Sequence, residues 1–288
     1  SPTVSCATDQ LVDFDENCQF EIADYNGFIT TSDNCSSNIT VTQSPAAGTF
    51  ISSAGAVTLT ANDGNGNTAS CSFMVSPSDN DIPTIACPAD QDVFLDQNCQ
   101  YALMDYTGMA TAGDNCGAVT VSQDVAAGTQ ITATTVVTLT VEDASGNTET
   151  CTFSVIPSDN IDPVAVCPPN QVVEFDSNCE FEIGDYKPLV MASDNCNATT
   201  IVQSPVEETL VSGPTLIEIT VVDPSGNSVD CSFMVTPEDN TLPTIACPTN
   251  QQEVLDANCQ FALLDYSGLA TIGDNCNTVF SVSQFPPA

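Results

Sequence analysis

Residues 151–167 read CTFSVIPSDNIDPVAVC, and this stretch, from Cys151 to Cys167, decides the fold. It predicts a strand, an acidic segment bounded by prolines, and then the first strand of a further unit. Near-copies occupy Cys71–Cys87 (CSFMVSPSDNDIPTIAC) and Cys231–Cys247 (CSFMVTPEDNTLPTIAC), and the chain opens on a shorter version that ends at Cys6. A segment that recurs this closely indicates a tandem array of like modules.

The spacing of these cysteines gives the length of the repeat. Cys6, Cys87, Cys167 and Cys247 recur at almost equal intervals in a chain of 288 residues. We therefore expect three whole repeats, residues 1–80, 81–160 and 161–240, and a truncated fourth, residues 241–288. The fourth stops before any counterpart of Cys71, so we interpret the sequence as a segment of a longer repetitive chain.

Apolar and polar residues alternate within each repeat. Cys18, Phe20 and Ile22 share one phase, and similar alternation runs through 39–43, 57–61 and 71–75. Period two with one buried face predicts antiparallel strands. The loop Asp63–Asn67 holds a glycine before its last residue, as a turn with positive φ requires. About seven strands in eighty residues predict an all-β fold of tandem immunoglobulin-like β-sandwiches, stapled by disulfides into an elongated rod.

The charge balance is extreme, with 38 acidic residues against one base, Lys187, and no histidine. Such a polyanion repels nucleic acid and anionic lipid, so we expect neither as a partner. Hydrophobic residues make up 42% of the chain and alternate regularly, which argues for folded modules instead of disorder. The carboxylates must be hydrated, hydrogen-bonded or bound to cations, because protein cations are nearly absent.

Fifteen cysteines, at fixed positions in each repeat, indicate disulfides and an oxidising compartment. Zinc is not expected, because the sequence has no CxxC pair and no histidine. No apolar run is long enough to cross a bilayer, so direct membrane insertion is not expected either. The predicted location is extracellular, at a cell surface.

Four cysteines per repeat allow three pairings. The first and last lie in predicted strands on the core face, and the middle two bracket a connection whose length is the same in every repeat. We therefore predict two bridges per repeat, with Cys247 left unpaired. The pairs are Cys6–Cys71, Cys18–Cys35, Cys87–Cys151, Cys99–Cys116, Cys167–Cys231, Cys179–Cys196 and Cys259–Cys276.

A family resemblance rests on a motif that recurs in every repeat. It comprises Asp143, Gly146, Asn147, Cys151, Phe153, Val155, Asp159, Asn160, Pro163, Cys167 and Pro168, and Asp114–Cys116 fits it too. The motif resembles the hyalin repeat (HYR) module. The resemblance implies an extracellular immunoglobulin-like module of adhesion and matrix proteins, whose usual pairing agrees with the bridges above. The array also resembles the giant surface adhesins of gliding Bacteroidota. The tryptophan often found in the family is absent, and Tyr25, Tyr106, Tyr186 and Tyr266 lie nearby instead.

Catalysis is not expected. There is no histidine to act as a base, the single lysine occurs in one repeat, and the cysteines are assigned to bridges. The acidic residues recur at equivalent positions, whereas an active site should be singular. The sequence calls for no essential cofactor.

Calcium binding at the repeat joints is the sharper hypothesis, since Ca²⁺ takes six to eight oxygen ligands. In an immunoglobulin-like topology the acidic joint should approach two loops of the following repeat. The alternative is that these residues only cap turns. The candidate ligands are Asp79, Asp81, Asp105, Asp114 and Asp143 at one joint, Asp159, Asp162, Asp185, Asp194 and Asp223 at the next, and Asp239, Asp265 and Asp274 at the third.

These observations predict a structural role. The chain is expected to be a stalk or filament segment of a cell-surface adhesin, spacing or presenting adhesive regions, with surface glycans, a substratum or other protein subunits as partners. One alternative is an array of glycan- or protein-binding modules, which requires exposed tyrosines at the loops. Another is a self-associating subunit of an extracellular sheath or filament.

Overall fold

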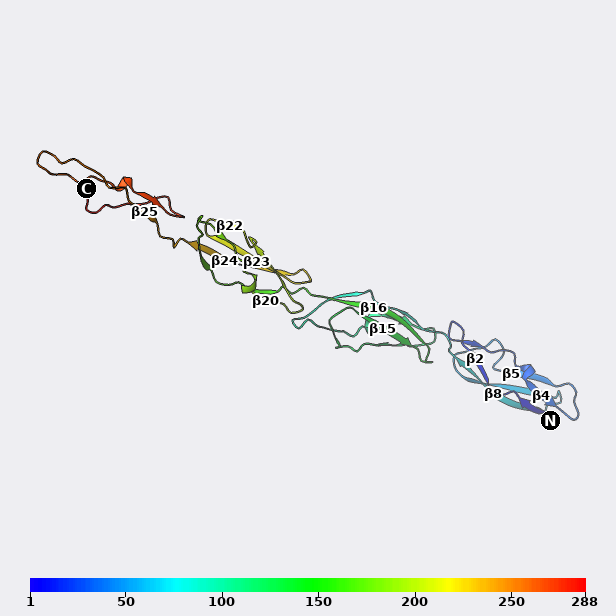
Figure 1. Ribbon diagram of the computed structural model, residues 1–288. Helices are drawn as coiled ribbons and strands as arrows, with labels where there is room; N and C mark the ends of the chain where they lie inside the picture. The colour runs from blue at the N-terminus through cyan, green and yellow to red at the C-terminus, as the bar shows by residue number, and fades with distance from the viewer. The chain divides into compact units, whose positions relative to one another are not determined.

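A computed structural model describes the whole chain, residues 1–288 (Figure 1). The chain forms two compact units, one of Ser1–Phe94 with Gln100–Ser158 and the other of Leu95–Cys99 with Asp159–Ala288. Both units are built from short strands, and the four helical segments are single 3₁₀ turns. No helix is long and apolar enough to cross a membrane.

The first repeat contains eight strands and one 3₁₀ turn. These elements are β1 (Thr3–Cys6), β2 (Gln10–Asp13), β3 (Phe20–Glu21), η1 (Asn26–Phe28), β4 (Ile29–Ser32), β5 (Thr40–Ser44), β6 (Phe50–Ile51), β7 (Gly55–Asn62) and β8 (Thr68–Ser78). A four-stranded sheet has the order β2-β8-β7-β5, and two small sheets pair β1 with β4 and β3 with β6. All pairs are antiparallel except β2 with β8, which is parallel.

The second repeat has the same order of elements. They are β9 (Thr84–Ala86), β10 (Gln91–Phe94), β11 (Tyr101–Ala102), η2 (Thr107–Met109), β12 (Thr111–Gly113), β13 (Thr120–Gln123), β14 (Gln130–Ile131), β15 (Thr135–Glu142) and β16 (Thr148–Ser158). Its main sheet is β10-β16-β15-β13, with β9-β12 and β11-β14 as the smaller sheets.

The third repeat follows the same plan, and the fourth is shorter. Their elements are β17 (Val164–Val166), β18 (Gln171–Glu174), β19 (Phe181–Glu182), η3 (Lys187–Leu189), β20 (Met191–Ser193), β21 (Thr200–Ser204), β22 (Leu210–Val211), β23 (Thr215–Val222), β24 (Ser228–Glu238), β25 (Thr244–Ala246), η4 (Ser267–Leu269) and β26 (Thr271–Gly273). The sheets are β18-β24-β23-β21, β17-β20, β19-β22 and β25-β26.

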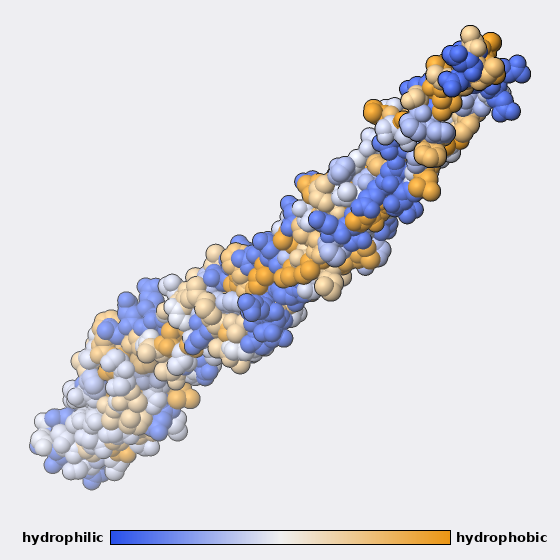
Figure 2. Space-filling model, turned by 90° about the vertical axis from the view of Figure 1, so that its left-hand side faces the viewer, coloured by the Kyte–Doolittle hydropathy of each residue, from blue (hydrophilic) through white to orange (hydrophobic).

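Each of the first three repeats has its own hydrophobic core. The alternation along β7 places Val57, Leu59 and Ala61 on the inner face, where each is fully buried. Phe73 and Val75 of β8 face the same core. Burying each such large apolar side chain contributes about 1.5–3 kcal/mol. On the outer surface, hydrophobic residues lie interspersed among hydrophilic ones (Figure 2).

A glutamine anchors the Asp-Tyr turn of each repeat. The Gln203 side chain is 4% exposed; its Oε1 accepts a hydrogen bond from the Tyr186 N–H at 2.8 Å, and its Nε2 donates to the Gly184 carbonyl at 2.9 Å. Gln43, Gln123 and Gln284 make equivalent bonds. Because a buried amide needs its partners, this glutamine fixes the turn that carries the tyrosine.

The structure corrects three expectations about the strands. The strand expected over 18–22 shrinks to β3, because Cys18 has φ 57° and cannot be extended backbone. The segment before it, for which the sequence predicts no strand, contains β2, which adds in parallel to the long β8. The long connection after Tyr25 contains β4, paired with β1. The strands over 57–61 and 71–75 lie within β7 and β8.

Candidate metal centres

The first acidic cluster comprises Asp79, Asp114 and Asp143. One carboxylate oxygen from each residue lies within 4.8 Å of the others. Each aspartate directly follows a strand: Asp79 follows β8, Asp114 follows β12, and Asp143 follows β15. The strand ends therefore bring together residues from the first and second repeats, and all three aspartates belong to the first compact unit.

Local hydrogen bonds orient these carboxylates. Asp143 Oδ1 accepts the N–H groups of Ser145 and Asn147, each at 2.8 Å, in the turn between β15 and β16. The Asn147 amide donates to Asp143 Oδ2 at 2.8 Å and to the Asp79 carbonyl at 3.2 Å. Asp114 Oδ2 accepts the Cys116 N–H at 2.7 Å. The side chain of Asn147 thus ties the turn of one repeat to the end of the repeat before it.

The cluster holds negative charge without a compensating protein cation. Asp79 is 8% exposed, and burial raises its pKa, with the carboxylates of Asp114 and Asp143 adding to the rise. Asp114 Oδ1 is buried and has no hydrogen-bond partner. For Asp143, burial raises the pKa, but the bonds from Asn147 and the turn amides outweigh it and hold the pKa low. Three carboxylates this close together repel one another, and a cation bound between them would offset that repulsion.

The second acidic cluster repeats this arrangement with Asp159, Asp194 and Asp223. Asp223 is 4% exposed, and Asn227 donates to its Oδ2 at 2.8 Å and to the Asp159 carbonyl at 3.2 Å. Asp159 Oδ2 and Asp194 Oδ1 are both buried without partners. All three residues belong to the second compact unit.

Several of the expected ligands lie outside the two clusters. Asp105 and Asp265 accept hydrogen bonds from residues two positions further along the chain, and Asp185 lies 3.5 Å from Lys187 Nζ. Asp162 is exposed. Asp81 Oδ2 accepts the Asn115 amide at 2.9 Å beside the first cluster.

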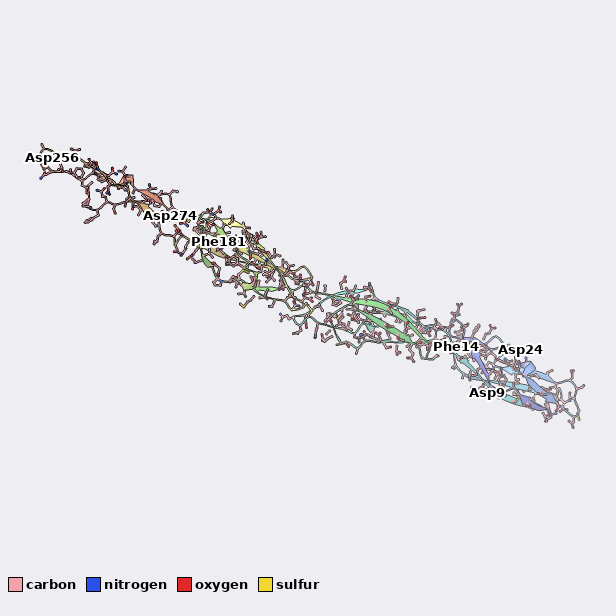
Figure 3. The ribbon with its side chains drawn as sticks, viewed as in Figure 1. Asp9, Phe14, Asp24, Phe181, Asp256 and Asp274 are labelled. Atoms are coloured by element: carbon pink, nitrogen blue, oxygen red, sulfur yellow. A yellow bond between two sulfur atoms is a disulfide. The ribbon has the colours of Figure 1, made fainter.

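Two further pairs occupy positions equivalent to parts of these clusters. Asp239 Oδ2 accepts the Asn277 amide at 3.2 Å, while the Asn277 N–H donates to Asp274 Oδ2 at 3.1 Å (Asp274 is labelled in Figure 3). Asp274 Oδ1 is buried without a partner. In the first repeat, Asp33 Oδ2 lies 3.5 Å from the terminal ammonium of Ser1. Asp33 and Asp274 are the counterparts of Asp114 and Asp194.

The bridge between the first and last cysteine of each complete repeat forms as expected. The pairs are Cys6–Cys71, Cys87–Cys151 and Cys167–Cys231. They connect the first strand of a repeat to its last, beside the hydrophobic core.

The middle cysteines correct the expected pairing. The structure has Cys18–Cys116, Cys99–Cys196 and Cys179–Cys276 in place of Cys18–Cys35, Cys99–Cys116, Cys179–Cys196 and Cys259–Cys276. Each bridge joins one repeat to the next, and Cys35, Cys247 and Cys259 are free. The two middle cysteines of each repeat lie at the two ends of a connection of constant length, but the fold does not bring these ends together.

Three asparagines whose role the sequence does not predict lie beside these bridges. Asn115 donates to the Asp15 carbonyl at 3.4 Å, Asn195 to the Asp96 carbonyl at 3.1 Å, and Asn275 to the Asp176 carbonyl at 3.0 Å. Each precedes the second cysteine of its bridge, within the recurring Asp-Asn-Cys triplet. The recurrence of the triplet was the available signal, but only the arrangement of the repeats reveals the partner loop.

The tyrosines at the loops do not form an exposed binding surface. Tyr25, Tyr106 and Tyr186 are at most 8% exposed. Their rings pack edge-on against Phe73, Phe153 and Phe233, with centroids 5.1–5.3 Å apart. The expectation of exposed tyrosines, on which a carbohydrate-binding array depends, is wrong for these three residues.

Comparison with solved structures finds arrays of protocadherin, cadherin and titin domains. The protocadherin gammaB7 EC3-6 cis-dimer structure has a TM-score of 0.41 and 12% identity, covering 87% of this chain and 77% of that one. Human CDH23 EC21-23 gives 0.38 and 14%, covering 79% and 97%. Titin domains I67-I69 give 0.35 and 10%, covering 82% and 98%. At these values the likeness assigns no ligand or assembly to this chain.

The comparison with protein families matches a smaller part of the chain but identifies one kind of domain. No curated protein matches the chain. Residues 78–156 match the family model of the HYR domain, and this stretch contains Asp79, Asp114 and Asp143. HYR domains are extracellular, in keeping with the six disulfides. The second repeat of the chain is therefore similar to an HYR domain.

Proposed function

We propose that the chain is a tension-bearing structural segment of an extracellular adhesin. In this role it spaces or presents adhesive regions at a cell surface, where they meet surface glycans, a substratum or other protein subunits. The resemblance to surface adhesins of gliding Bacteroidota supports the finer part of this proposal. The single observation that carries it is the set of disulfides that join successive repeats.

These bridges form a covalent route that avoids most of the chain. From Cys18 the route crosses to Cys116, runs back along the short segment that holds β12, η2 and β11 to Cys99, and crosses to Cys196. It then runs back along the equivalent segment to Cys179 and crosses to Cys276. Tension applied along the chain can therefore pass through the bridges and these short segments, while the strands of the four-stranded sheets lie outside the route.

The consequence is a limit on extension. A fully extended chain spans about 3.3–3.6 Å per residue, so the peptide between Cys18 and Cys276 would reach roughly 900 Å without bridges. Along the bridged route the same two residues separate by only about 130 Å. A module that unfolds under load consequently adds little length. This behaviour suits a tether that must hold its spacing.

Single-molecule extension tests the proposal directly. Cys35, Cys247 and Cys259 are replaced by serine throughout, and the chain is held at its two ends. The oxidised chain should reach about 230 Å at high force. A variant that also carries serine at Cys18, Cys116, Cys99, Cys196, Cys179 and Cys276 should reach about 340 Å.

The control variant keeps the bridges between repeats and removes those within them, at Cys6–Cys71, Cys87–Cys151 and Cys167–Cys231. Its limit should remain at about 230 Å, because the shortest covalent route is almost unchanged. If the oxidised chain extends as far as the variant without inter-repeat bridges, these bridges do not carry tension and the proposed role is wrong.

A further inference from the structure

We propose that each acidic cluster binds one calcium ion. Three carboxylate oxygens within 4.8 Å of one another are close enough to contact a single ion, because Ca²⁺–oxygen distances are roughly 2.3–2.6 Å. The two clusters have the same composition and the same strand-end positions in successive repeats. The proposal does not depend on the mechanical role above.

A second observation, independent of how close the carboxylates lie, also points to a bound cation: several oxygens in the clusters are buried and have no hydrogen-bond donor. At the first cluster, Asp114 Oδ1 is buried and unpartnered, and the Asp79 side chain is 8% exposed. At the second, Asp159 Oδ2 and Asp194 Oδ1 are both buried and unpartnered. Leaving a buried carboxylate oxygen without a hydrogen-bond donor is unfavourable, and a bound cation would give each of these oxygens a partner. The chain has one lysine, and that lysine pairs with Glu207 and Asp185 instead.

Turn capping alone does not account for the clusters. In the turn, Asp114 Oδ2 accepts the hydrogen bond from the Cys116 N–H. The other oxygen, Asp114 Oδ1, has no hydrogen-bond donor. The same division holds at Asp194, where Oδ2 accepts the Cys196 N–H at 2.9 Å. Capping therefore orients each carboxylate so that its second oxygen remains available for a ligand.

The surroundings favour calcium over a transition metal. The groups at the clusters are hard oxygen donors, and neither histidine nor a free thiol belongs to either cluster. Asn195 Oδ1 is a further buried oxygen without a donor, on a side chain whose Nδ2 lies 3.4 Å from Asp159 Oδ1. A surface hollow lined by Glu16, Asp81, Asp114 and Asn115 gives an acidic approach to the first cluster.

Calorimetric titration of the whole oxidised chain provides the first test. The protein is stripped with EDTA, dialysed, and titrated with CaCl₂ in 150 mM NaCl. We expect two ions per chain, one ion for Asp114→Asn, and none for the double variant D114N/D194N. Asparagine keeps the size of the side chain and an oxygen that accepts the Cys116 N–H, so the turn is preserved.

The matched control is D105N/D265N, which removes two exposed carboxylates outside the clusters and should still bind two ions. Thermal unfolding gives a second readout. Calcium should raise the melting temperature of the natural chain by about 5 °C or more. D114N/D194N should not respond to calcium, and in EDTA it should melt at or above the natural chain because charge repulsion is relieved.

Three results would overturn the proposal. The first is that the natural chain takes up no calcium at millimolar concentration. The second is that D105N/D265N loses binding as completely as D114N/D194N, and the third is that Mg²⁺ gives the same stoichiometry and the same stabilisation. The last two would show a diffuse counterion effect of a polyanion instead of a built site.

Discussion

Cys18 of the first repeat is bonded to Cys116 of the second, 98 residues away, while Cys35, which is far closer to it along the chain, is free. The bond pattern recurs at Cys99–Cys196 and Cys179–Cys276. Neighbouring repeats are therefore joined twice, once through the main chain and once through sulfur.

Disulfide mapping should show this arrangement in the oxidised protein. Digestion without reduction, followed by mass spectrometry, is expected to yield a peptide pair containing Cys18 and Cys116. Cys116→Ser should expose one additional thiol, at Cys18, to a maleimide reagent. Cys35→Ser should instead remove one reactive thiol and leave all six bridges intact. A cross-linked peptide pair containing Cys18 and Cys35 would contradict the structure.

Asn147 should contribute more to stability than its counterpart in the first repeat. Its amide donates both to Asp143 Oδ2 and to the Asp79 carbonyl, whereas Asn67 donates only to Asp63 Oδ2, at 2.7 Å. Hydrogen bonds to charged groups contribute about 1.5–3 kcal/mol, and a neutral one adds about 1 kcal/mol.

Urea unfolding followed by circular dichroism measures the difference. Asn147→Ala should lower the free energy of unfolding by about 1 kcal/mol more than Asn67→Ala does. Equal losses in the two variants would mean that the bond to Asp79 contributes nothing.

Asp124 should make the second repeat sensitive to acid. Burial raises its pKa, but the N–H groups of Thr138 at 2.9 Å and Val125 at 2.8 Å outweigh burial and hold the pKa below the usual 3.8. Because the folded pKa is lower than the unfolded one, Asp124 stabilises the fold above pH 3.8 and loses that contribution as the pH falls through its folded pKa.

The measurement is the urea midpoint between pH 7 and pH 2. Asp124→Asn should lower the midpoint at pH 7 and flatten its decline below about pH 4. The exposed Asp92→Asn should leave the profile unchanged. An undiminished acid transition in Asp124→Asn would assign the sensitivity to other carboxylates.

The aromatic ring of Tyr106 should contribute more to the stability of the fold than its hydroxyl group does. The side chain is fully buried, its hydroxyl oxygen makes no hydrogen bond of good geometry, and burial is the main reason that its pKa rises to about 12. Tyr106→Phe should change the free energy of unfolding by less than about 0.5 kcal/mol, whereas Tyr106→Ala should cost about 3–5 kcal/mol. Thermal unfolding of the two variants checks both values. A large loss in Tyr106→Phe would reveal a partner for the hydroxyl.

The sequence predicts the strands whose alternation is regular and strongly apolar. Residues 57–61 and 71–75 lie in β7 and β8, because Leu59 and Phe73 occur in phase with a buried face. It does not predict β2, where Leu11 is 85% exposed and Gln10 and Asp13 are polar. That strand forms because the long β8 offers a free edge, which is a tertiary property.

The candidate sites, like the strands, could be predicted from the sequence only in part. Asp79, Asp114 and Asp143 are three of the five aspartates that the sequence predicts at the first joint, because an immunoglobulin-like topology places that joint beside two loops of the following repeat. The inter-repeat bridges were not predicted. In a periodic array, a cysteine paired within its repeat and one paired with the next repeat both recur at a constant separation. Only the placement of one loop against its neighbour distinguishes the two.

The loop that carries Cys18 has a conformation of its own. Cys18, Cys99 and Cys179 have φ of 57°, 58° and 60°, and the unbonded Cys259 has 58°. In the loop of Cys259, Asp256 Oδ1 accepts the N–H groups of Asn258 and Gln260 at 2.8 and 2.9 Å. The left-handed turn therefore belongs to the Asp-x-Asn-Cys sequence and not to the disulfide.

This independence sets an order for oxidative maturation. As the polypeptide emerges N-terminus first, each repeat can close its own bridge and hold a preorganised thiol on its surface. That thiol meets a partner only when the Asp-Asn-Cys triplet of the following repeat has folded. Each inter-repeat disulfide can therefore form only after the following repeat has been synthesised and folded. Its formation requires that both repeats it joins have reached their native structure.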